Sequence, residues 1–235
     1  MTDSWGTIKR YNGNINIAVV DDHYLFRAGI ISLLKDYEDL NVVIQASNGK
    51  DLFKQLKNYT ESAKRSLPDV ILLDIQMPEM DGIETTIQLQ KDYPDIKIVI
   101  LTMHNEEEFI FDLMNKGASG FLAKDKTVDM VLDAIYSVMN TGIYFNEQIL
   151  QAIVRGSQGK LKTPEFSKDT DLSEREIEII QLICDQKTNR QIAEILEVSQ
   201  RTIEAHRTAI ASKTGVKNTA GLVLFAIKNN LIQTT

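Results

Sequence analysis

The feature that most constrains the fold is a repeated alternation between short apolar runs and helical patterns. Five runs rich in β-branched residues occupy positions 15–20, 42–46, 70–74, 97–101 and 120–123. Their nearly continuous apolarity is typical of strands that are covered on both faces, as in a parallel sheet. Helical spacing of apolar residues occurs at 25–34, 51–56, 83–89, 107–114 and 128–139. The sequence therefore predicts an α/β doubly wound domain on a five-stranded parallel sheet.

The pattern changes in the last third of the chain. Residues 155–171 are polar, with Gly, Ser, Pro and mixed charge, which is typical of a flexible linker. Beyond it no strand pattern occurs, and capping boxes at Ser173 and Thr188 predict two helix starts. Ser199 and Thr219 are expected to cap a third and a fourth helix. The expected organisation is a tail at 1–14, an α/β domain at 15–140, a linker at 141–167 and a small all-α domain at 168–235.

Composition excludes several classes of protein. The 235 residues, 43% of them hydrophobic, are enough for two cores. Cys184 is the single cysteine, so an internal disulfide is excluded, and its apolar helical surroundings predict a packed thiol. No apolar run approaches membrane-spanning length, and residues 1–14 lack the apolar core of a secretory signal. We therefore expect a cytoplasmic location and no membrane partner.

The distribution of charge points to one segment as a partner for nucleic acid. The formal net charge is −7, which by itself argues against such a partner. Residues 187–228, however, hold 7 basic and 3 acidic side chains, a local excess of +4. We therefore expect phosphate contacts to be confined to this part of the chain.

Acidic residues follow two of the predicted strands at the point where each ends. Asp21 and Asp22 come after the first strand, and Asp74 ends the third. Ligands of open parallel sheets bind beyond the carboxyl ends of the strands, and neighbouring carboxylates there repel one another and raise at least one pKa. Mg²⁺ relieves that conflict because it takes oxygen ligands and commonly binds one or two carboxylates plus a phosphate. The pattern predicts a site where the carboxylate of Asp74 accepts a phosphoryl group.

Two further polar residues follow later strands. Thr102 ends the fourth strand with a hydroxyl, and Lys124 follows the fifth with an ammonium group. Both are groups that a phosphoryl oxygen would recruit. Each residue alone is more simply an ordinary polar group in a loop, and Asp81–Gly82 is most simply a turn that starts a helix. Only the ordered set of acid pair, single acid, hydroxyl and ammonium at successive strand ends indicates this chemistry.

The stretches "VVDDH", "DVILLDIQMPEMDG", "ILTMH" and "GASGFLAK" resemble the receiver domain of bacterial two-component response regulators, a flavodoxin-like fold, over residues 15–140. The resemblance implies that a sensor histidine kinase passes a phosphoryl group to Asp74. It also implies that Asp22, Asp74 and the backbone carbonyl of Gln76 ligate Mg²⁺, with Asp21 acting mainly through a metal-bound water.

The same resemblance implies a conformational switch formed by residues of the fourth and fifth strands and the positions that follow them. Thr102 and Lys124 would turn toward the phosphoryl group, and Phe121 matches the switch aromatic. A plain core aromatic is the alternative for Phe121. At most, slow self-dephosphorylation is expected, so the protein is not expected to be an enzyme.

Several positions depart from the family pattern or stay ambiguous. Many receivers have Lys-Pro where this chain has Lys124–Asp125, and a cis bond before a non-proline residue costs about 3 kcal/mol, so none is assigned. Gln76 and His104 stand where the family tunes the lifetime of the phosphoryl group, and our hypothesis is that His104 shapes self-dephosphorylation. His23 is interpreted either as part of a kinase-docking surface or as an ordinary helix-start residue.

The C-terminal segment has the form of a helix-turn-helix. A helix at 189–196 and a turn at 197–199 precede a longer helix, on which Ile203 and Ile210 share the inward face at about 100° per residue. Small and polar residues lie opposite, as needed to enter a major groove, and basic residues at the margins suit phosphate contacts. The predicted DNA contacts are Gln200, Arg201, Glu204, Ala205, His206, Arg207, Thr208, Lys213 and Lys217.

A small helical bundle with a solvated face is the alternative. The stretch "LSEREIEIIQLICDQKTNRQIAEILEVSQRTIEAHRTAIASKTGV" resembles the LuxR-type helix-turn-helix over residues 168–232, and a receiver plus this module is the arrangement of the NarL/FixJ class. The resemblance implies double-stranded DNA as a partner, a homodimer when phosphorylated, and RNA polymerase as a further contact. Glu204 either accepts from cytosine or repels phosphate, so the preferred bases stay open.

Two rival functions are alternatives to this interpretation. A Mg²⁺-dependent phosphatase with an aspartyl-phosphate would want a second acid two residues after the nucleophile, where this chain has Gln76. A regulator that ignores phosphate is the other rival, against which the intact acidic set argues. In the expected off state the receiver either masks the recognition helix or prevents dimerisation.

Overall fold

The structure is a computed structural model that describes residues 11, 13–61, 66–103, 107–146, 149, 151, 155 and 171–232. His104, most of the expected linker and most of the expected N-terminal tail lie outside the described residues.

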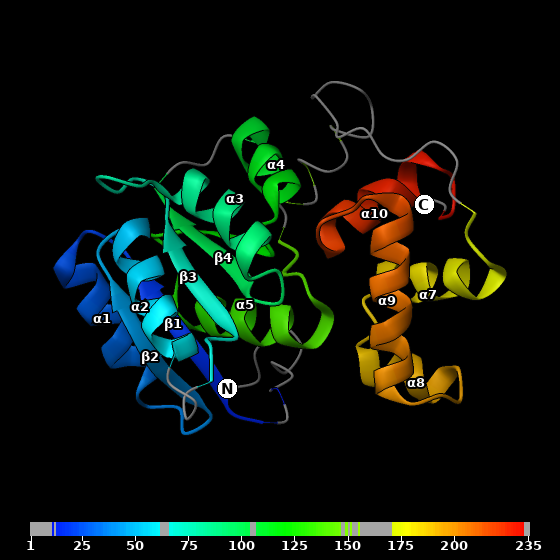
Figure 1. Ribbon diagram of the computed structural model, residues 1–235, viewed down its shortest axis with the longest axis horizontal. Helices are drawn as coiled ribbons and strands as arrows, with labels where there is room; N and C mark the ends of the chain where they lie inside the picture. Colours follow the sequence, from blue (N-terminus) through cyan, green and yellow to red (C-terminus); the bar gives the residue numbers. More distant parts are fainter. Residues whose placement is uncertain are drawn as a thin grey trace.

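The first part of the chain forms a five-stranded sheet whose paired strands are all parallel (Figure 1). The spatial order is β2-β1-β3-β4-β5. The strands are β1 (Ile15–Val20), β2 (Leu40–Ala46), β3 (Val70–Asp74), β4 (Lys97–Thr102) and β5 (Gly120–Ala123). The predicted doubly wound sheet is confirmed; β2 starts earlier than expected, at Leu40, and β4 runs on to Thr102.

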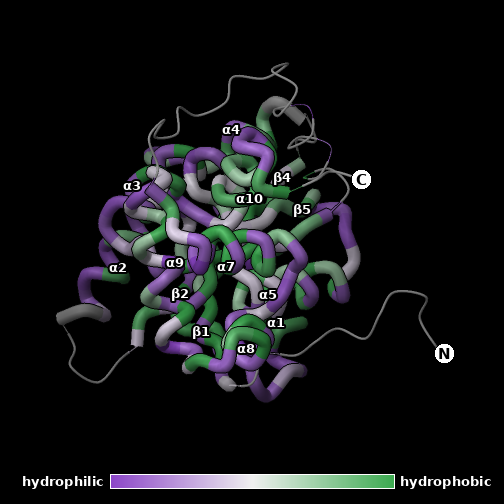
Figure 2. The backbone as a smooth tube through the Cα atoms, turned by 90° about the vertical axis from the view of Figure 1, so that its right-hand side faces the viewer, coloured by the Kyte–Doolittle hydropathy of each residue, from purple (hydrophilic) through white to green (hydrophobic). Residues whose placement is uncertain are grey.

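Five helices cover the two faces of this sheet. They are α1 (Tyr24–Leu34), α2 (Gly49–Glu61), α3 (Gly82–Asp92), α4 (Glu107–Lys116) and α5 (Val128–Thr141). Residues of α1 and α5 share one apolar cluster with one face of the sheet, whereas residues of α2, α3 and α4 share another with the opposite face. Figure 2 shows strands in mostly hydrophobic colours and helices in mixed ones, as expected when only one side of each helix is buried.

Alternation along β1 shows how one strand serves both faces. Ile17 and Val19 belong to the cluster with α1 and α5, and Ala18 and Val20 belong to the cluster with α2, α3 and α4. Successive side chains of a strand point to opposite faces, so a strand covered on both sides must be apolar throughout. This is why the strands read as continuous apolar runs in the sequence.

Four helices follow in the C-terminal part: α7 (Glu174–Cys184), α8 (Asn189–Ile195), α9 (Gln200–Thr214) and α10 (Thr219–Lys228). The capping boxes of Ser173 and Thr188 are present, and the Ser199 side chain accepts from the backbone of Thr202, so these three predicted caps are confirmed. The fourth prediction is wrong, because the cap of α10 is Asn218 and not Thr219. Asn218 has extended backbone angles, and its side chain accepts from the amide of Gly221.

The helical part has its own core, and α10 also reaches the sheet domain. Leu222 and Ala226 pack with the cores of α7, α8 and α9, whereas Ala220 and Leu224 belong to the cluster that contains Phe111 and other α4 residues. Figure 1 shows α10 on the side of the helical part that faces the sheet domain. One helix therefore contributes to two cores.

Cys184 is partly buried next to that helical core. Burial, followed by the nearby charge of Asp185, raises the pKa of its thiol to about 12. The thiolate needed for nucleophilic chemistry is therefore disfavoured, which agrees with a packed thiol.

Candidate functional site

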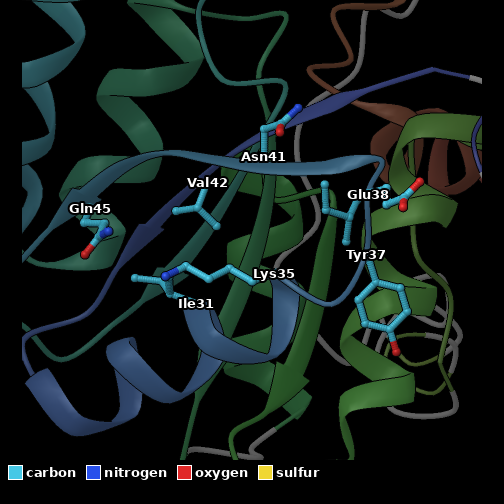
Figure 3. Close-up of a pocket in the computed structure, with 8 residues that line it drawn as sticks. Ile31, Lys35, Tyr37, Glu38, Asn41, Val42 and Gln45 are labelled. Atoms are coloured by element: carbon cyan, nitrogen blue, oxygen red, sulfur yellow. The ribbon is translucent and has the colours of Figure 1, made fainter.

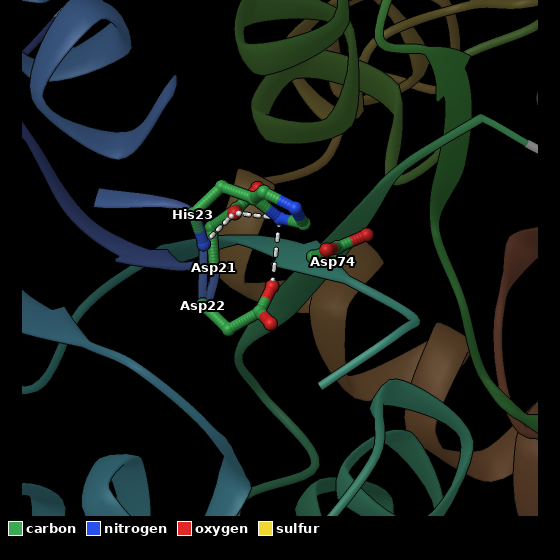
Figure 4. A group of neighbouring side chains, drawn as sticks. All are labelled: Asp21, Asp22, His23 and Asp74. Carbon is green, nitrogen blue, oxygen red and sulfur yellow. Dashed lines mark hydrogen bonds and ion pairs between the residues drawn. The ribbon is translucent and has the colours of Figure 1, made fainter. Parts of the chain in front are cut away.

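The acidic residues converge because β1 and β3 are neighbours in the sheet. Val20 pairs with Leu73, so the residues that follow both strands emerge at the same sheet edge. Asp21, Asp22 and Asp74, together with His23, offer ligand atoms that all lie within 4.8 Å of one another (Figure 4). The convergence expected from the sequence is therefore present.

Lys124 lies between two of these carboxylates. Its Nζ is 2.7 Å from Oδ2 of Asp21 and 2.7 Å from Oδ2 of Asp74, and the three side chains are only 9%, 2% and 4% exposed. The ammonium also lies over the Phe26 ring, 4.8 Å from its centroid. The backbone holds this position, because the amide of Lys124 donates to the carbonyl of Thr102 across β4 and β5 at 2.8 Å. Two buried carboxylates thus share one ammonium.

The electrostatics of this triad leave an excess of negative charge. Burial raises the pKa of Asp74, Lys124 lowers it and Asp21 raises it further, and the net shift is upward. For Lys124, burial opposes the charged form, but its bonds to Asp21 and Asp74 outweigh that effect and raise its pKa. A site with more negative than positive charge, built from oxygen donors, fits a hard divalent cation such as Mg²⁺.

His23 holds the acidic pair on its outer side. Its backbone amide donates to Oδ1 of Asp21 at 2.8 Å, and its Nδ1 lies 2.8 Å from Oδ1 of Asp22. The ring is 70% exposed, and the residue precedes α1 without a capping bond from its side chain. Its position at a helix start agrees with one of the two interpretations, while docking of a kinase stays a prediction.

A tight turn packs against the backbone of Asp74. Asp81 caps α3 by accepting from the amide of Glu84 at 2.8 Å, which agrees with the turn interpretation of Asp81–Gly82. A Cβ at Gly82 would lie 2.3 Å from the carbonyl oxygen of Asp74 and 2.7 Å from Cα of Ile75. Sequence reasoning missed this close approach, although the Asp-Gly pair carries a signal for it. Only glycine fits there, so it helps fix the backbone of Asp74.

The remaining predicted residues of this domain surround the same edge. Thr102 ends β4 and is 1% exposed, and Gln76 is exposed just beyond β3. Phe121 is 1% exposed within the cluster that contains Ile110 and Phe111, as a core aromatic would be. The described chain has no cis peptide bond, so Lys124–Asp125 is trans.

A pocket of about 330 Å³ lies elsewhere, between α1 and the edge strand β2 (Figure 3). Its lining includes Ile31 and Lys35 from α1 and Asn41, Val42 and Gln45 from β2. None of the predicted site residues lines it, so the candidate chemistry stays with the acidic edge.

The predicted recognition surface is on α9. Ile203 and Ile210 are 0% exposed, as the helical phase predicts. Most of the residues expected to face DNA are exposed, namely Gln200, Arg201, Glu204, Ala205, Thr208, Lys213 and Lys217, whereas His206 is half-buried. This exposed face is compatible with a major groove.

Two of the predicted basic contacts also have partners within the chain. Arg207 turns inward, where its guanidinium donates to Oδ1 of Asn189 at 3.1 Å and to Oγ1 of Thr219 at 2.8 Å, and burial lowers its pKa. Lys213 is exposed, but its Nζ lies 2.7 Å from Glu176, in an ion pair that ties α9 to α7. Arg207 is therefore held by partners of its own domain in this conformation, whereas Lys213 stays exposed, and phosphate contact by either residue stays a prediction.

Comparison with known families gives two matches. A model described as the response regulator receiver domain matches residues 17–136, and a model of bacterial regulatory proteins of the luxR family matches residues 170–226. Transcriptional regulatory protein DegU of Brevibacillus brevis is 31% identical over 232 residues, covering 93% of this chain and 95% of that protein. Oxygen regulatory protein NreC of Staphylococcus epidermidis is 33% identical over 224 residues, covering 93% of this chain and 100% of that protein.

Solved structures show the same folds. A two-component response regulator of the LuxR family from Aurantimonas sp. is 26% identical with a TM-score of 0.53, covering 61% of this chain and 98% of that one. RcsB of Salmonella enterica serovar Typhimurium, bound to promoter DNA, is 24% identical with a TM-score of 0.53, covering 92% and 100%. The RcsB similarity supports the fold alone. Among the described residues, none of the helices combines the length and apolarity that a membrane crossing requires.

Proposed function

This chain belongs to the response regulators that join a receiver domain to a LuxR-type DNA-binding domain and regulate transcription, and from that premise we propose that phosphorylation of Asp74 controls it. The single observation that carries the proposal is the convergence of Asp21, Asp22 and Asp74 on Lys124 at one edge of the sheet. We further propose that residues 15–140 act as the receiver and 168–235 as the DNA-binding domain, joined by 141–167.

The proposed reaction moves a phosphoryl group from a sensor histidine kinase to this chain. A carboxylate oxygen of Asp74 attacks the phosphorus, the P–N bond of the kinase's phosphohistidine breaks, and the imidazole leaves with the bonding electrons. Asp22, Asp74 and the carbonyl of Gln76 would hold Mg²⁺, with Asp21 close by. Bound there, the ion would neutralise charge on the transferring oxygens.

The product must change the local contacts of the site. Lys124 now bridges Asp74 and Asp21, and a phosphoryl group on Asp74 offers this ammonium stronger acceptors. Thr102 would donate its hydroxyl to the same group, and Phe121 would repack as the switch aromatic. These changes bias a surface with two arrangements.

The proposed output is DNA binding by a homodimer. Two C-terminal domains would place their α9 helices in half-sites about one helical turn apart on double-stranded DNA. RNA polymerase is a further partner in this proposal. The exposed face of α9, carrying Arg201, Glu204 and Thr208, supports it.

Intact mass spectrometry with a small-molecule phosphodonor tests the chemical step. Wild-type protein is expected to gain one phosphoryl group when Mg²⁺ is present, and neither Asp74→Asn nor wild type in EDTA is expected to gain it. Absence of an acyl phosphate on Asp74 under donor and metal would remove the proposal. In the same assay, His104→Ala tests self-dephosphorylation, and an unchanged decay rate contradicts a role for His104.

Selection of DNA from a random library, with and without the donor, tests the output. The phosphorylated protein is expected to enrich a two-half-site sequence and to elute as a larger species. Equal enrichment by Asp74→Asn and by phosphorylated wild type would favour a regulator that ignores phosphate. Turnover of phosphomonoesters would favour a phosphatase, which Gln76 in the place of a second acid argues against.

A further inference from the structure

A polar contact joins the amino end of α10 to the carboxyl end of α4. The Nδ2 of Asn218 donates to the carbonyl of Met114 at 2.9 Å and to the carbonyl of Ala118 at 2.6 Å. The Oδ1 of the same side chain accepts from the amide of Gly221 at 2.8 Å, which caps α10. Both functional atoms of one amide are therefore used, one in each domain.

This arrangement caps two helices with one side chain. The last carbonyls of an α-helix lack partners within the helix, and those at the end of α4 need donors from elsewhere. The amide of Gly117 lies near the carbonyls of Leu113 and Met114, and Asn218 supplies further N–H bonds to Met114 and to Ala118. A shift of α4 cannot keep these bonds unless α10 follows.

The neighbouring residues extend the contact to the recognition helix. Arg207 on α9 donates to Oγ1 of Thr219 at 2.8 Å and lies 3.5 Å from the carbonyl of Thr141, at the end of α5. Gly142 follows at positive φ, and a Cβ there would lie 2.5 Å from Oγ1 of Thr219 and 3.1 Å from Nη2 of Arg207. The receiver therefore closes over an arginine that would otherwise stand at the margin of the DNA-binding face.

We propose that Asn218 is a latch between the two domains, and that the latched arrangement withholds Arg207 from DNA. The proposal rests on the proposed function only in assigning DNA binding to α9; the latch itself is a contact between α4 and α10. When α4 moves away from Asn218, Arg207 loses its contact with Thr141 and the receiver surface that covers it, and it can then exchange its bonds to Asn189 and Thr219 for a phosphate.

The interface also contains a feature that opposes closure. Lys97 at the start of β4 is partly buried, and burial followed by the charge of Arg207 lowers its pKa. Two cations of different domains thus repel each other, while Asp95 partly offsets the effect. The two hydrogen bonds of Asn218 are between neutral groups, and the repulsion between Lys97 and Arg207 opposes them. A small change in the free energy of docking can therefore break the contact.

Asn218→Asp separates the two roles of the side chain. Aspartate is as good an N-cap as asparagine, so the bond from Gly221 and the start of α10 are kept. The donor to Met114 and Ala118 is lost, and a carboxylate would face two carbonyl oxygens. Asn229→Asp is the matched control, because Asn229 is exposed at the other end of α10 and bonds within that helix to Phe225.

Hydrogen exchange of the full unphosphorylated chain measures directly how often the contact between α4 and α10 opens. Amides at the end of α4 and in α10 are expected to exchange about tenfold faster in Asn218→Asp than in wild type or Asn229→Asp, since two hydrogen bonds and a new repulsion are involved. Unchanged exchange in Asn218→Asp, or equal acceleration in Asn229→Asp, would overturn the latch.

Fluorescence anisotropy measures the effect on DNA binding, with a duplex enriched from the random library by full-length Asn218→Asp in the absence of phosphodonor. Unphosphorylated Asn218→Asp is expected to bind that duplex about tenfold more tightly than unphosphorylated wild type, because the apparent Kd scales inversely with the open fraction. A loosened α10 with unchanged affinity overturns the claim that the contact withholds Arg207. Tighter binding by Asn218→Asp in a protein that never forms an acyl phosphate keeps the latch and refutes the proposed function instead.

Discussion

Replacing Lys124 with methionine should expose how much the buried acids depend on their shared cation. The change keeps an unbranched stem over Phe26 but removes an ammonium that lies 2.7 Å from both Asp21 and Asp74. Their side chains are 2% and 4% exposed, so water screens the remaining repulsion poorly. Removing one partner from a buried ion pair costs about 3–5 kcal/mol, and that is the loss in unfolding free energy we expect without metal.

Urea unfolding in EDTA measures this loss. With a denaturant slope of about 2 kcal/mol per molar, the midpoint should fall by about 1.5–2.5 M. Because the two domains can unfold separately, the receiver is followed through hydrogen exchange of peptides from β1 and β3. Lys126→Met is the control. Lys126 is 39% exposed and its Nζ lies as far as 3.9 Å from Oδ1 of Asp125, and an exposed pair of this kind contributes at most about 1 kcal/mol.

Mg²⁺ should partly reverse the effect. A ligand that binds the folded state stabilises it, and the variant has acids with no competing ammonium, so its gain from Mg²⁺ should exceed that of wild type. An equal midpoint for Lys124→Met and wild type in EDTA would refute the reasoning, as would equal stabilisation of both proteins by Mg²⁺.

Three further outcomes are expected. The hydrogen bond from Lys213 is the main cause that holds the pKa of Glu176 below its ordinary 4.5, so the stabilising contribution of Glu176 is complete above that pH and is lost as pH falls through the lowered value. Glu176→Gln should therefore weaken the fall of the melting temperature on the acid side of its pH profile. A profile parallel to that of wild type would contradict this. Gly82→Ala should slow phosphorylation of Asp74 and destabilise the receiver, because its Cβ would meet backbone 2.3 Å away; unchanged phosphorylation kinetics in the mass assay would be the contrary result. Lys217→Ala should weaken binding to all duplexes alike and reduce the slope of log affinity against log salt by about 1, with a change in base preference as the opposing outcome.

The sheet and its acidic edge could be predicted because each follows from short-range rules. Buried parallel strands require continuous apolar runs, and the carboxyl ends of β1 and β3 meet wherever those strands are neighbours. The carboxylates of Asp21 and Asp74 therefore had to approach each other. The sharing of Lys124 between them could not be deduced, because the rotamer of a long side chain depends on the surrounding packing.

The α10 cap and the inward turn of Arg207 could not be predicted, for a different physical reason. Asn218 and Thr219 are adjacent residues with similar capping ability, and the choice depends on backbone angles that the tertiary structure sets. Helical phase placed Arg207 at the margin of a face, but its long side chain can turn either way. A contact to backbone carbonyls leaves no pattern in the sequence, so the docking of α10 on α4 was invisible there.

The packing of α10 in two hydrophobic cores has a thermodynamic consequence. Ala220 and Leu224 are 3% and 1% exposed while α10 lies on α4, and separation of the domains would expose both side chains to water. Water penalises such exposure by roughly 25 cal/mol per Å². Kosmotropic salt should therefore favour docking, whereas a rise in protein concentration should favour undocked chains that bury the same residues against one another.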